Sequence, residues 1–296
     1  MIRLGLCCKF SDQPILFKTT TATYLKKLTK KQRYQRLSDL CTNNANMLQK
    51  AAEYCIENKV GCFRVNSKIL PLKTHPQLGY DLLSLPDGKE IVNKFRNCGV
   101  YAQEHNLRFS FHPDQFILLS SPNKDVTRRS IEELEYQSQV SDWIGADVIN
   151  IHGGGGYGDK KSALSRFLIA FKQVSRNMRK KLTIENDDRV YTPEDLLPIC
   201  EKSGIPLVYD VHHHRCLPDN LTIEQATKKA LATWDREPLF HISSSRQGWQ
   251  SKTPGPHHDY INIKDWPVCW SSLDITVEVE AKAKELAVKK LHKQLY

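Results

Sequence analysis

Short apolar runs of strand character recur along the chain, and six of them end on a histidine or a carboxylate. A fully buried strand needs only apolar residues, so metal-ligand side chains at the ends of so many runs indicate one shared site. The pattern predicts a polynuclear metal centre at the mouth of a parallel barrel. The six runs are Phe109 to His112, Val148 to His152, Leu182 to Glu185, Pro206 to Asp210, Leu239 to His241 and Ile275 to Glu280.

Stretches of ten or more residues with helical periodicity separate these runs, which is typical of βαβ units and a parallel sheet. Eight strands can be counted, and eight predict an α/β fold that closes as a (β/α)8 TIM barrel, with its active site at the carboxyl ends of the strands. A chain of 296 residues fits one such domain over residues 1–296. The predicted strands are Ile2 to Cys7, Cys62 to Val65, Arg108 to Phe111, Val148 to Ile151, Leu182 to Ile184, Pro206 to Tyr209, Leu239 to Ile242 and Ile275 to Val279.

The formal net charge of +10 makes an anionic partner plausible, and nucleic acid comes first because Lys and Arg neutralise its phosphates. Charge alone is weak support, since many of these residues lie in helical runs such as Lys26 to Arg36, which are commonly solvated faces. The longest apolar stretches fall far short of the roughly 20 residues of a membrane span. Met1 to Cys8 also lacks the regions of a signal peptide. We therefore expect a cytoplasmic protein with no membrane partner.

Nine candidate ligands fall in or just beyond the carboxyl ends of the predicted strands, where a barrel places its active site. Each one alone is more often a hydrogen-bonded structural residue, but nine in this position are an improbable coincidence. Mixed imidazole and carboxylate ligation suits Mn, Zn or Fe better than Ca or Mg. Two or three such ions can hold a hydroxide nucleophile and stabilise a departing oxygen. This chemistry is typical of a metal-dependent phosphodiesterase. The nine are His75, His112, His152, Glu185, Asp210, His213, His241, His257 and Glu280.

Three consecutive histidines follow Asp210 and Val211, and spacing alone leaves open which of them is a metal ligand. Asp210 offers a carboxylate at the end of a strand, and an imidazole in the turn beyond can serve an adjacent ion. We expect His213 to be that ligand, with His212 and His214 as ambiguous neighbours.

An ordered series of motifs, nearly end to end, resembles the UV damage endonucleases, which are similar to endonuclease IV in fold and metal chemistry. One motif alone would carry little weight, whereas the ordered series is specific. The series comprises Met1-Ile2-Arg3-Leu4-Gly5, Phe63-Arg64-Val65, Thr74-His75-Pro76, His112-Pro113-Asp114-Gln115-Phe116, Asn150-Ile151-His152-Gly153-Gly154, Glu185-Asn186-Asp187, Asp210 to His213, Phe240-His241-Ile242-Ser243, His257-His258-Asp259-Tyr260 and Val279-Glu280-Ala281-Lys282.

The resemblance implies a ligand set and an activity. Glu185, Asp210, His241 and Glu280 would hold the deepest ion; His75, His112, His152, His213 and His257 would complete the others. Two or three divalent ions are implied, with Mn expected ahead of Zn. Glu185, His241 and His257 would take part in catalysis. The implied substrate is damaged double-stranded DNA, nicked 5′ to ultraviolet photoproducts and to other lesions or abasic sites to leave a 3′-hydroxyl. No protein partner is required.

Gln115 and Phe116 stand where the family has a Gln-Tyr pair that wedges into the duplex beside flipped bases. Phenylalanine keeps the aromatic plane for stacking and loses the hydroxyl. The alternative for Phe116 is a buried loop anchor.

Three positions depart from the family pattern. The family has a tyrosine and an asparagine where this chain has Leu6 and Phe10, which affects the expected lesion contacts. It also has a carboxylated, metal-ligating lysine two residues before the histidine of the seventh strand, where this chain has Leu239. Residues two apart on a strand share a face, so Leu239 should point into the barrel beneath His241. The expected consequence is that one ion binds less tightly or is absent.

Two other functions remain open from the sequence. A sugar isomerase of the xylose-isomerase type shares the barrel and a carboxylate and histidine site, although the basic charge and the many histidines favour the nuclease. A catalytically weakened protein that binds damaged DNA is the second alternative, and Leu239 is the residue that supports it.

Overall fold

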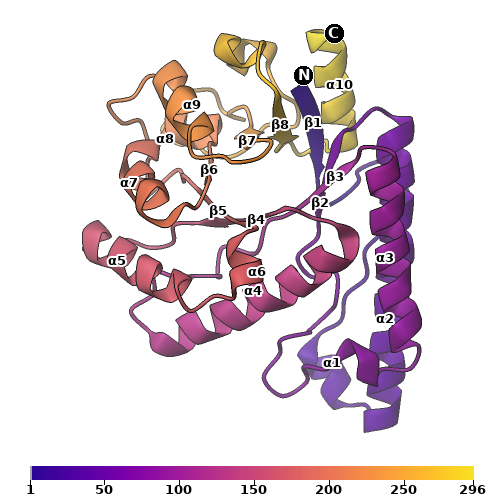
Figure 1. The fold of residues 1–296 in the computed structure, drawn as a ribbon. Coiled ribbons are helices and arrows are strands. Elements are labelled where there is room, and N and C mark those ends of the chain that lie inside the picture. The colour runs from indigo at the N-terminus through magenta and orange to yellow at the C-terminus, as the bar shows by residue number, and fades with distance from the viewer. Residues whose placement is uncertain (1) are drawn as a thin grey trace.

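Eight parallel strands form the centre of the computed structural model, which describes residues 2–296. Helices alternate with the strands and lie around them, with α2 beside α3 and α10 next to β1 (Figure 1). The TIM barrel predicted from the sequence is confirmed. The strands are β1 Ile2–Cys7, β2 Cys62–Val65, β3 Arg108–Phe111, β4 Val148–His152, β5 Leu182–Glu185, β6 Leu207–Val208, β7 Leu239–Ile242 and β8 Ile275–Val279.

The helices show the start and stop signals expected of their sequences. In α7, Thr192 caps the first turn, Pro193 occupies the first position, and Gly204 ends the helix with a φ of 72° that glycine adopts without strain. The helices are α1 Ala22–Lys26, α2 Lys30–Glu57, α3 Gly88–Glu104, α4 Lys124–Ile144, α5 Lys160–Phe171, α6 Arg176–Arg179, α7 Pro193–Ser203, α8 Val211–Cys216, α9 Ile223–Leu231 and α10 Glu285–Leu295, with 3-10 turns at Leu82–Ser84, Ile263–Asp265 and Val268–Trp270. Within residues 2–296, no helix is long and apolar enough to span a membrane.

The barrel closes at β6, which is shorter than predicted. The strands pair in the order β6-β5-β4-β3-β2-β1-β8-β7, and between β6 and β7 an isolated bridge joins Asp210 to His241. Asp210 ends the strand early because its side chain accepts the backbone N–H of His213 at 2.8 Å and so begins α8. This closure sets a carboxylate of one strand end against a histidine of the next.

The interior of the barrel changes character from one end to the other. Val148, Val208 and Leu239 form a small apolar cluster of their own. The next layer is polar and fully buried, and includes Ser110, Asn150 and Glu278. Strand register explains the layering, because Leu239 pairs with Thr276 and His241 pairs with Glu278 across β7 and β8. The candidate ligands therefore sit on a buried polar layer.

Candidate metal centre

Glu185 lies in the middle of the site, and its two oxygens face different histidines. Oε1 is 3.0 Å from His241 Nδ1 and 3.3 Å from His213 Nδ1. Oε2 is 2.8 Å from His112 Nε2 and 4.0 Å from His152 Nδ1. A carboxylate placed between two sets of imidazoles can contribute one oxygen to each of two ions.

Neighbouring amides fix the two central carboxylates. Asn150 donates from Nδ2 to Glu185 Oε2 at 2.6 Å, and its own Oδ1 accepts from Thr183 at 3.0 Å. Asn186 makes two hydrogen bonds to the backbone of Asp210, each of 2.9 Å. Asn150 was not among the residues predicted for the site, although its position two residues before His152 on β4 places both side chains on one face.

Seven of the nine predicted ligands lie together. Three groups have ligand atoms within 4.8 Å of one another, namely His112 with His152 and Glu185, His112 with His241 and Glu280, and Glu185 with Asp210 and His213. Donor atoms at such spacing can share an ion, because ligand bonds to zinc, for example, are about 2 Å long.

The other two predicted ligands lie outside these groups. His257 is at the rim, with Nδ1 at 3.7 Å from Glu280 Oε2. His75 lies along a separate surface hollow with Asp114 and Phe116, and its Nδ1 accepts from the backbone of Gln77 at 3.1 Å. Among the described residues, His75 therefore has no carboxylate or histidine partner that places it in the centre. His75 lies within the long connection after β2, where no strand fixes the direction of its side chain.

The histidines beside His213 have other contacts. His212 Nε2 is 2.8 Å from the carbonyl oxygen of Gly255. His214 lies between the hydroxyl of Tyr209 at 2.7 Å and Asp219 at 2.9 Å. Of the three, His213 is the one whose ring nitrogen faces Glu185 and Asp210, at 3.3 and 3.4 Å.

The electrostatics of the site follow from its burial and its alternating charges. Burial alone would raise the pKa of the Glu185 carboxyl, but His241, His152 and His112 hold that pKa well below its usual value. Burial would lower the pKa of His213, and the carboxylates of Asp210 and Glu185 instead raise it well above the usual value. The pKa of His241 is raised to about 10, since Glu185 outweighs burial. The site thus stabilises positive charge at its centre.

Two buried donor atoms support the fit of this site to cations. His152 Nδ1 and Asp210 Oδ2 are buried and have no hydrogen-bond partner among the described residues. Leaving such atoms unpaired costs about 1 to 3 kcal/mol each. Both residues belong to the groups that could hold an ion, so a bound cation would satisfy both.

Arg64 is a polar residue of the site that was not predicted as a ligand, although it stands in the motif Phe63-Arg64-Val65. It lies inside the barrel on β2, with Nη1 at 2.6 Å from Glu280 Oε1 and Nε at 2.5 Å from Glu278 Oε2. Its Nη2 is 2.8 Å from His241 Nε2. Side chains alternate between the two faces of β8, so Glu278 and Glu280 share a face. This alternation could have identified Glu278 once Glu280 was predicted to face the site.

The predicted wedge residues lie in the loop after β3. Gln115 is exposed, and the Phe116 side chain is 70% exposed. Phe116 is therefore not a buried loop anchor. Its position beside the mouth of the barrel leaves the aromatic ring open to a ligand.

The three departures from the family pattern are all packed in the structure. Leu239 is fully buried with Val148 and Val208, beneath His241 as expected. Leu6 is fully buried in the main core. Phe10 packs on Phe63 with ring centroids 5.8 Å apart. Neither Leu6 nor Phe10 offers a polar group to a lesion.

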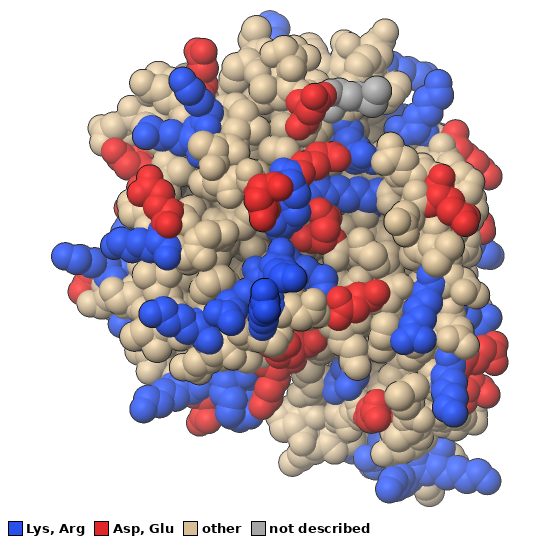
Figure 2. Space-filling model, in the orientation of Figure 1, with Lys and Arg blue, Asp and Glu red and all other residues tan. Residues whose placement is uncertain are grey.

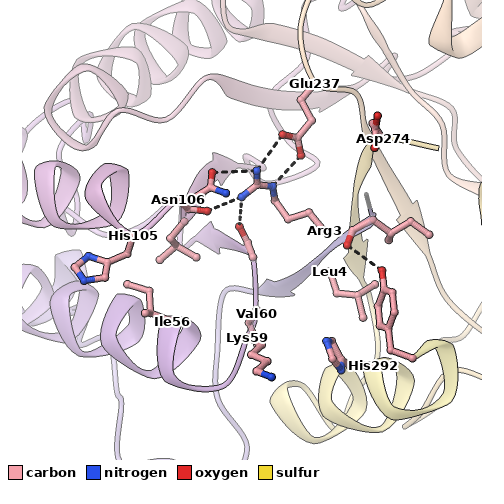
Figure 3. A pocket seen from close by; sticks show the side chains of 14 residues that line it. Arg3, Leu4, Ile56, Lys59, Val60, His105, Asn106, Glu237, Asp274 and His292 are labelled. Atoms are coloured by element: carbon pink, nitrogen blue, oxygen red, sulfur yellow. Dashed lines mark hydrogen bonds and ion pairs between the residues drawn. The ribbon is translucent and has the colours of Figure 1, made fainter. Parts of the chain in front are cut away.

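A hollow of about 710 Å³ opens at the amino-terminal end of the barrel (Figure 3). Arg3 lies within it and pairs with Glu237 at 2.8 Å and with the carbonyl oxygen of Gly61 at 3.2 Å. These residues come before or at the start of strands, and that end of a TIM barrel serves stability while the opposite end carries the chemistry. The hollow is therefore separate from the candidate metal centre.

The positive charge is not segregated on the face of the molecule shown in Figure 2. Lys and Arg side chains gather near the centre of this view, and Asp and Glu side chains are interspersed among them. On this face, attraction to an anionic polymer would come from the net charge of +10 and not from one continuous basic surface.

Comparison with known proteins identifies the family. The chain matches the family model of UV-endonuclease UvdE over residues 2–296. The chain belongs to this family. A UV DNA damage endonuclease of Bacillus cereus (strain G9842) is 33% identical over 286 residues, which cover 94% of this chain and 89% of the relative. The family makes this protein a DNA repair endonuclease, and the resemblance stated from the motifs is confirmed.

Solved structures agree with the family. The crystal structure of SacUVDE is 27% identical with a TM-score of 0.88, and the match covers 100% of this chain and 98% of that one. Endonuclease IV from Thermus thermophilus has a TM-score of 0.64 at 14% identity, with 99% of this chain and 97% of that chain covered. At that identity the second match shows the fold alone.

Proposed function

We propose that this UvdE family member is a metal-dependent endonuclease that nicks damaged double-stranded DNA immediately 5′ to ultraviolet photoproducts and leaves a 3′-hydroxyl. Other lesions and abasic sites are proposed as further substrates. The observation that carries the proposal is the position of Glu185, whose two oxygens face His241 and His213 on one side and His112 on the other. This arrangement supports a centre of two or three divalent ions, with Mn ahead of Zn.

In this proposal, the ligands bind ions at different depths in the barrel. Glu185, Asp210, His241 and Glu280 would hold the deepest ion, and His112, His152 and His213 the outer ones, with His257 at the rim and the more distant His75 completing the set. Bound ions would supply a hydroxide nucleophile near neutral pH and stabilise the departing oxygen. Asn150 donates to the Glu185 carboxylate at 2.6 Å, and Asn186 holds the backbone of Asp210 through a hydrogen bond of 2.9 Å. We propose Glu185, His241 and His257 as the catalytic residues.

Recognition of damage would fall to the loop after β3. The exposed ring of Phe116, with Gln115 beside it, is available to stack in the gap left by extruded bases. Stacking of this kind is worth about 1 to 3 kcal/mol per base. It would select lesions because damaged bases are cheaper to unstack than intact ones.

Nicking of supercoiled plasmid tests the proposal directly. Irradiated and untreated plasmid are incubated with the protein and MnCl2, with ZnCl2 and EDTA in parallel reactions. We expect relaxation of irradiated plasmid with metal and none with EDTA, and extension of the nick by a DNA polymerase without prior end repair. Absence of damage-dependent nicking with every metal would overturn the proposal. Lesion-specific gel retardation without cleavage would favour the damage-binding protein instead.

A further inference from the structure

Glu278 is a fully buried carboxylate in the layer directly beneath the proposed ligands. It lies on β8 and pairs in register with His241 on β7. Its Oε2 is 3.0 Å from His241 Nε2 and 2.5 Å from Arg64 Nε, and its Oε1 accepts a hydrogen bond from Ser110. Only 1% of Glu278 is exposed, so these contacts are made without competition from water.

The two nitrogens of His241 face different surroundings. Nδ1 faces the proposed ligands, at 3.0 Å from Glu185 and 3.5 Å from Glu280. Nε2 faces away from them, toward Glu278 at 3.0 Å and Arg64 at 2.8 Å. A cation bound at Nδ1 uses the lone pair there, so the remaining proton of the neutral ring must sit on Nε2. Arg64 can only donate hydrogen bonds, so Glu278 is the partner that can accept this proton.

The barrel makes room for Glu278 at Gly5. Gly5 of β1 pairs with Glu278 on one side and with Cys62 of β2 on the other. A Cβ atom at position 5 would lie 3.0 Å from Glu278 Cγ and 3.2 Å from Cys62 Cβ. The missing side chain therefore lets Glu278 lie across β1 to reach Arg64 on β2, while His241 lies on β7, the neighbour of β8 on the other side.

Leucine at position 239 supplies no carboxylate to this layer. Leu239 is apolar and packed one layer below His241, against Val148 and Val208. A longer acidic side chain at position 239 would have to extend toward the mouth of the barrel, into the layer that Glu278 occupies. The carboxylate beneath His241 in this chain comes from the neighbouring strand and needs no modification.

We propose that Glu278 is a positioning residue, which accepts the Nε2 proton of His241 and so holds the ring in the tautomer and orientation that bind metal through Nδ1. The inference rests on the metal-dependent reaction proposed above. Metal-ligating histidines commonly donate their second nitrogen to a carboxylate, and loss of that partner commonly costs 10- to 100-fold in metal affinity. The competing role for Glu278 is that of a counter-ion to Arg64 alone.

Metal affinity separates these two roles. Glu278→Gln and Glu278→Leu are compared with the natural protein by equilibrium dialysis against MnCl2. Glu237→Gln is the matched control, because Glu237 pairs with Arg3 at 2.8 Å at the other end of the barrel. We expect the dissociation constant for Mn2+ to rise about 10- to 100-fold in both Glu278 variants and to stay unchanged in the control. The Mn2+ concentration for half-maximal nicking should rise by the same factor, with KM for irradiated plasmid unchanged.

A further variant keeps the test valid if loss of the buried charge prevents folding. Glu278→Asp withdraws the carboxylate from His241 and Arg64 by one methylene, but it keeps the buried negative charge near Arg64, which also retains its contact with Glu280 at 2.6 Å. We expect its melting temperature without metal to stay near that of the natural protein, while its Mn2+ affinity falls.

The outcomes distinguish the inference from the proposed function. Unchanged Mn2+ affinity in a folded Glu278→Gln or Glu278→Asp protein would overturn the positioning role and leave the metal-dependent endonuclease intact. Failure of the natural protein to bind Mn2+ or to nick irradiated plasmid would overturn the proposed function.

Discussion

His241 Nδ1 lies 3.0 Å from Glu185 Oε1, although the two residues come from β7 and β5, on either side of the point where the barrel closes. Asp210 provides the closing bridge to His241 at that point, and its Oδ2 is 3.9 Å from the same nitrogen. Closure of the barrel and assembly of the candidate centre therefore depend on the same residues.

Glu185→Gln should abolish nicking and leave the fold intact. The amide keeps the size of the side chain, but it removes the negative charge that faces His241, His213 and His112. We expect a loss of at least about 100-fold in activity, the upper end of what loss of an outer-shell partner costs. Plasmid nicking and far-ultraviolet circular dichroism would be measured together. Normal turnover in a folded variant would remove Glu185 from the site.

Metal binding should release protons and strengthen as the pH rises. The pKa of His241 is raised from 6.5 to about 10, and that of His213 is also raised. Both rings are therefore doubly protonated and positively charged at neutral pH when no metal is bound. Their charged forms stabilise the metal-free fold fully below about pH 6.5, and this contribution is lost as the pH rises through the raised values. A cation must displace these protons. We expect Mn2+ affinity to increase throughout the range from pH 6.5 to 8.5, because this range lies below the raised pKa of His241.

Calorimetry in Pipes and in Tris buffer measures the released protons, because the two buffers take up protons with different enthalpies. Binding heats that differ between buffers are the expected result. Equal heats and an affinity independent of pH would contradict the protonated state of the metal-free site.

Gln115→Ala with Phe116→Ala should weaken binding to damaged duplex more than it weakens phosphodiester cleavage. Both side chains are exposed in the loop after β3, and the groups of described residues that could hold an ion include neither of them. Loss of one stacked base, about 1 to 3 kcal/mol, corresponds to a decrease of about 5- to 150-fold in affinity. Fluorescence anisotropy with damaged and undamaged oligonucleotides measures it. Val268→Ala is the control, since Val268 is 89% exposed on the segment that leads into β8. An unchanged affinity for both duplexes would refute the wedge.

Strand ends could be predicted from the sequence because one physical rule governs them. An apolar run that meets a histidine or carboxylate predicts the end of a barrel strand; β4 and β5 end at His152 and Glu185, and β3 ends one residue before His112. Family membership was predictable from the order of the motifs. The same rule cannot place His75, which follows a connection without regular strand structure.

Polar residues inside the barrel were harder to predict because they break the expectation of an apolar core. Arg64 and Glu278 stand inside runs that look like ordinary strands, and each is acceptable there because the other neutralises it, 2.5 Å away. A partner on another strand cannot be identified from one sequence. Alternation along β8 was the available signal for Glu278.

Gly5→Ala should reproduce part of the effect of losing Glu278. The added methyl group would lie 3.0 Å from Glu278 Cγ, so the glutamate must shift from the position in which it contacts His241 and Arg64. We expect a small decrease in melting temperature and a decrease in Mn2+ affinity smaller than that of Glu278→Gln. The double variant is the control, because residues that act through one contact are not additive. Full additivity of the two effects on metal affinity would separate Gly5 from this role.

Leu239 predicts the number of tightly bound ions. No carboxylated lysine can form at this position, so an ion that needs such a ligand must use water instead or be absent. Glu278 does not replace that ligand, because its carboxylate contacts His241 Nε2 and Arg64 on the side away from the other proposed ligands. We therefore expect two ions to remain after dialysis against a mild chelator. Retention of three ions, measured by elemental analysis, would show that another residue supplies the ligand.

Leu239→Lys tests the same position by introducing the lysine that this chain lacks. Leu239 is fully buried beside Val148 and Val208, so an unmodified ammonium would be desolvated and would repel the ions above it. Without bicarbonate we expect a lower melting temperature and lower metal content than in the natural protein. With bicarbonate, carboxylation would convert the cation into an anionic ligand, and metal retention should rise. Leu239→Met has similar length and no amine, so its metal content should not respond to bicarbonate. If the lysine variant also fails to respond while folded, the space above position 239 is closed to a ligand, and Leu239 serves packing alone.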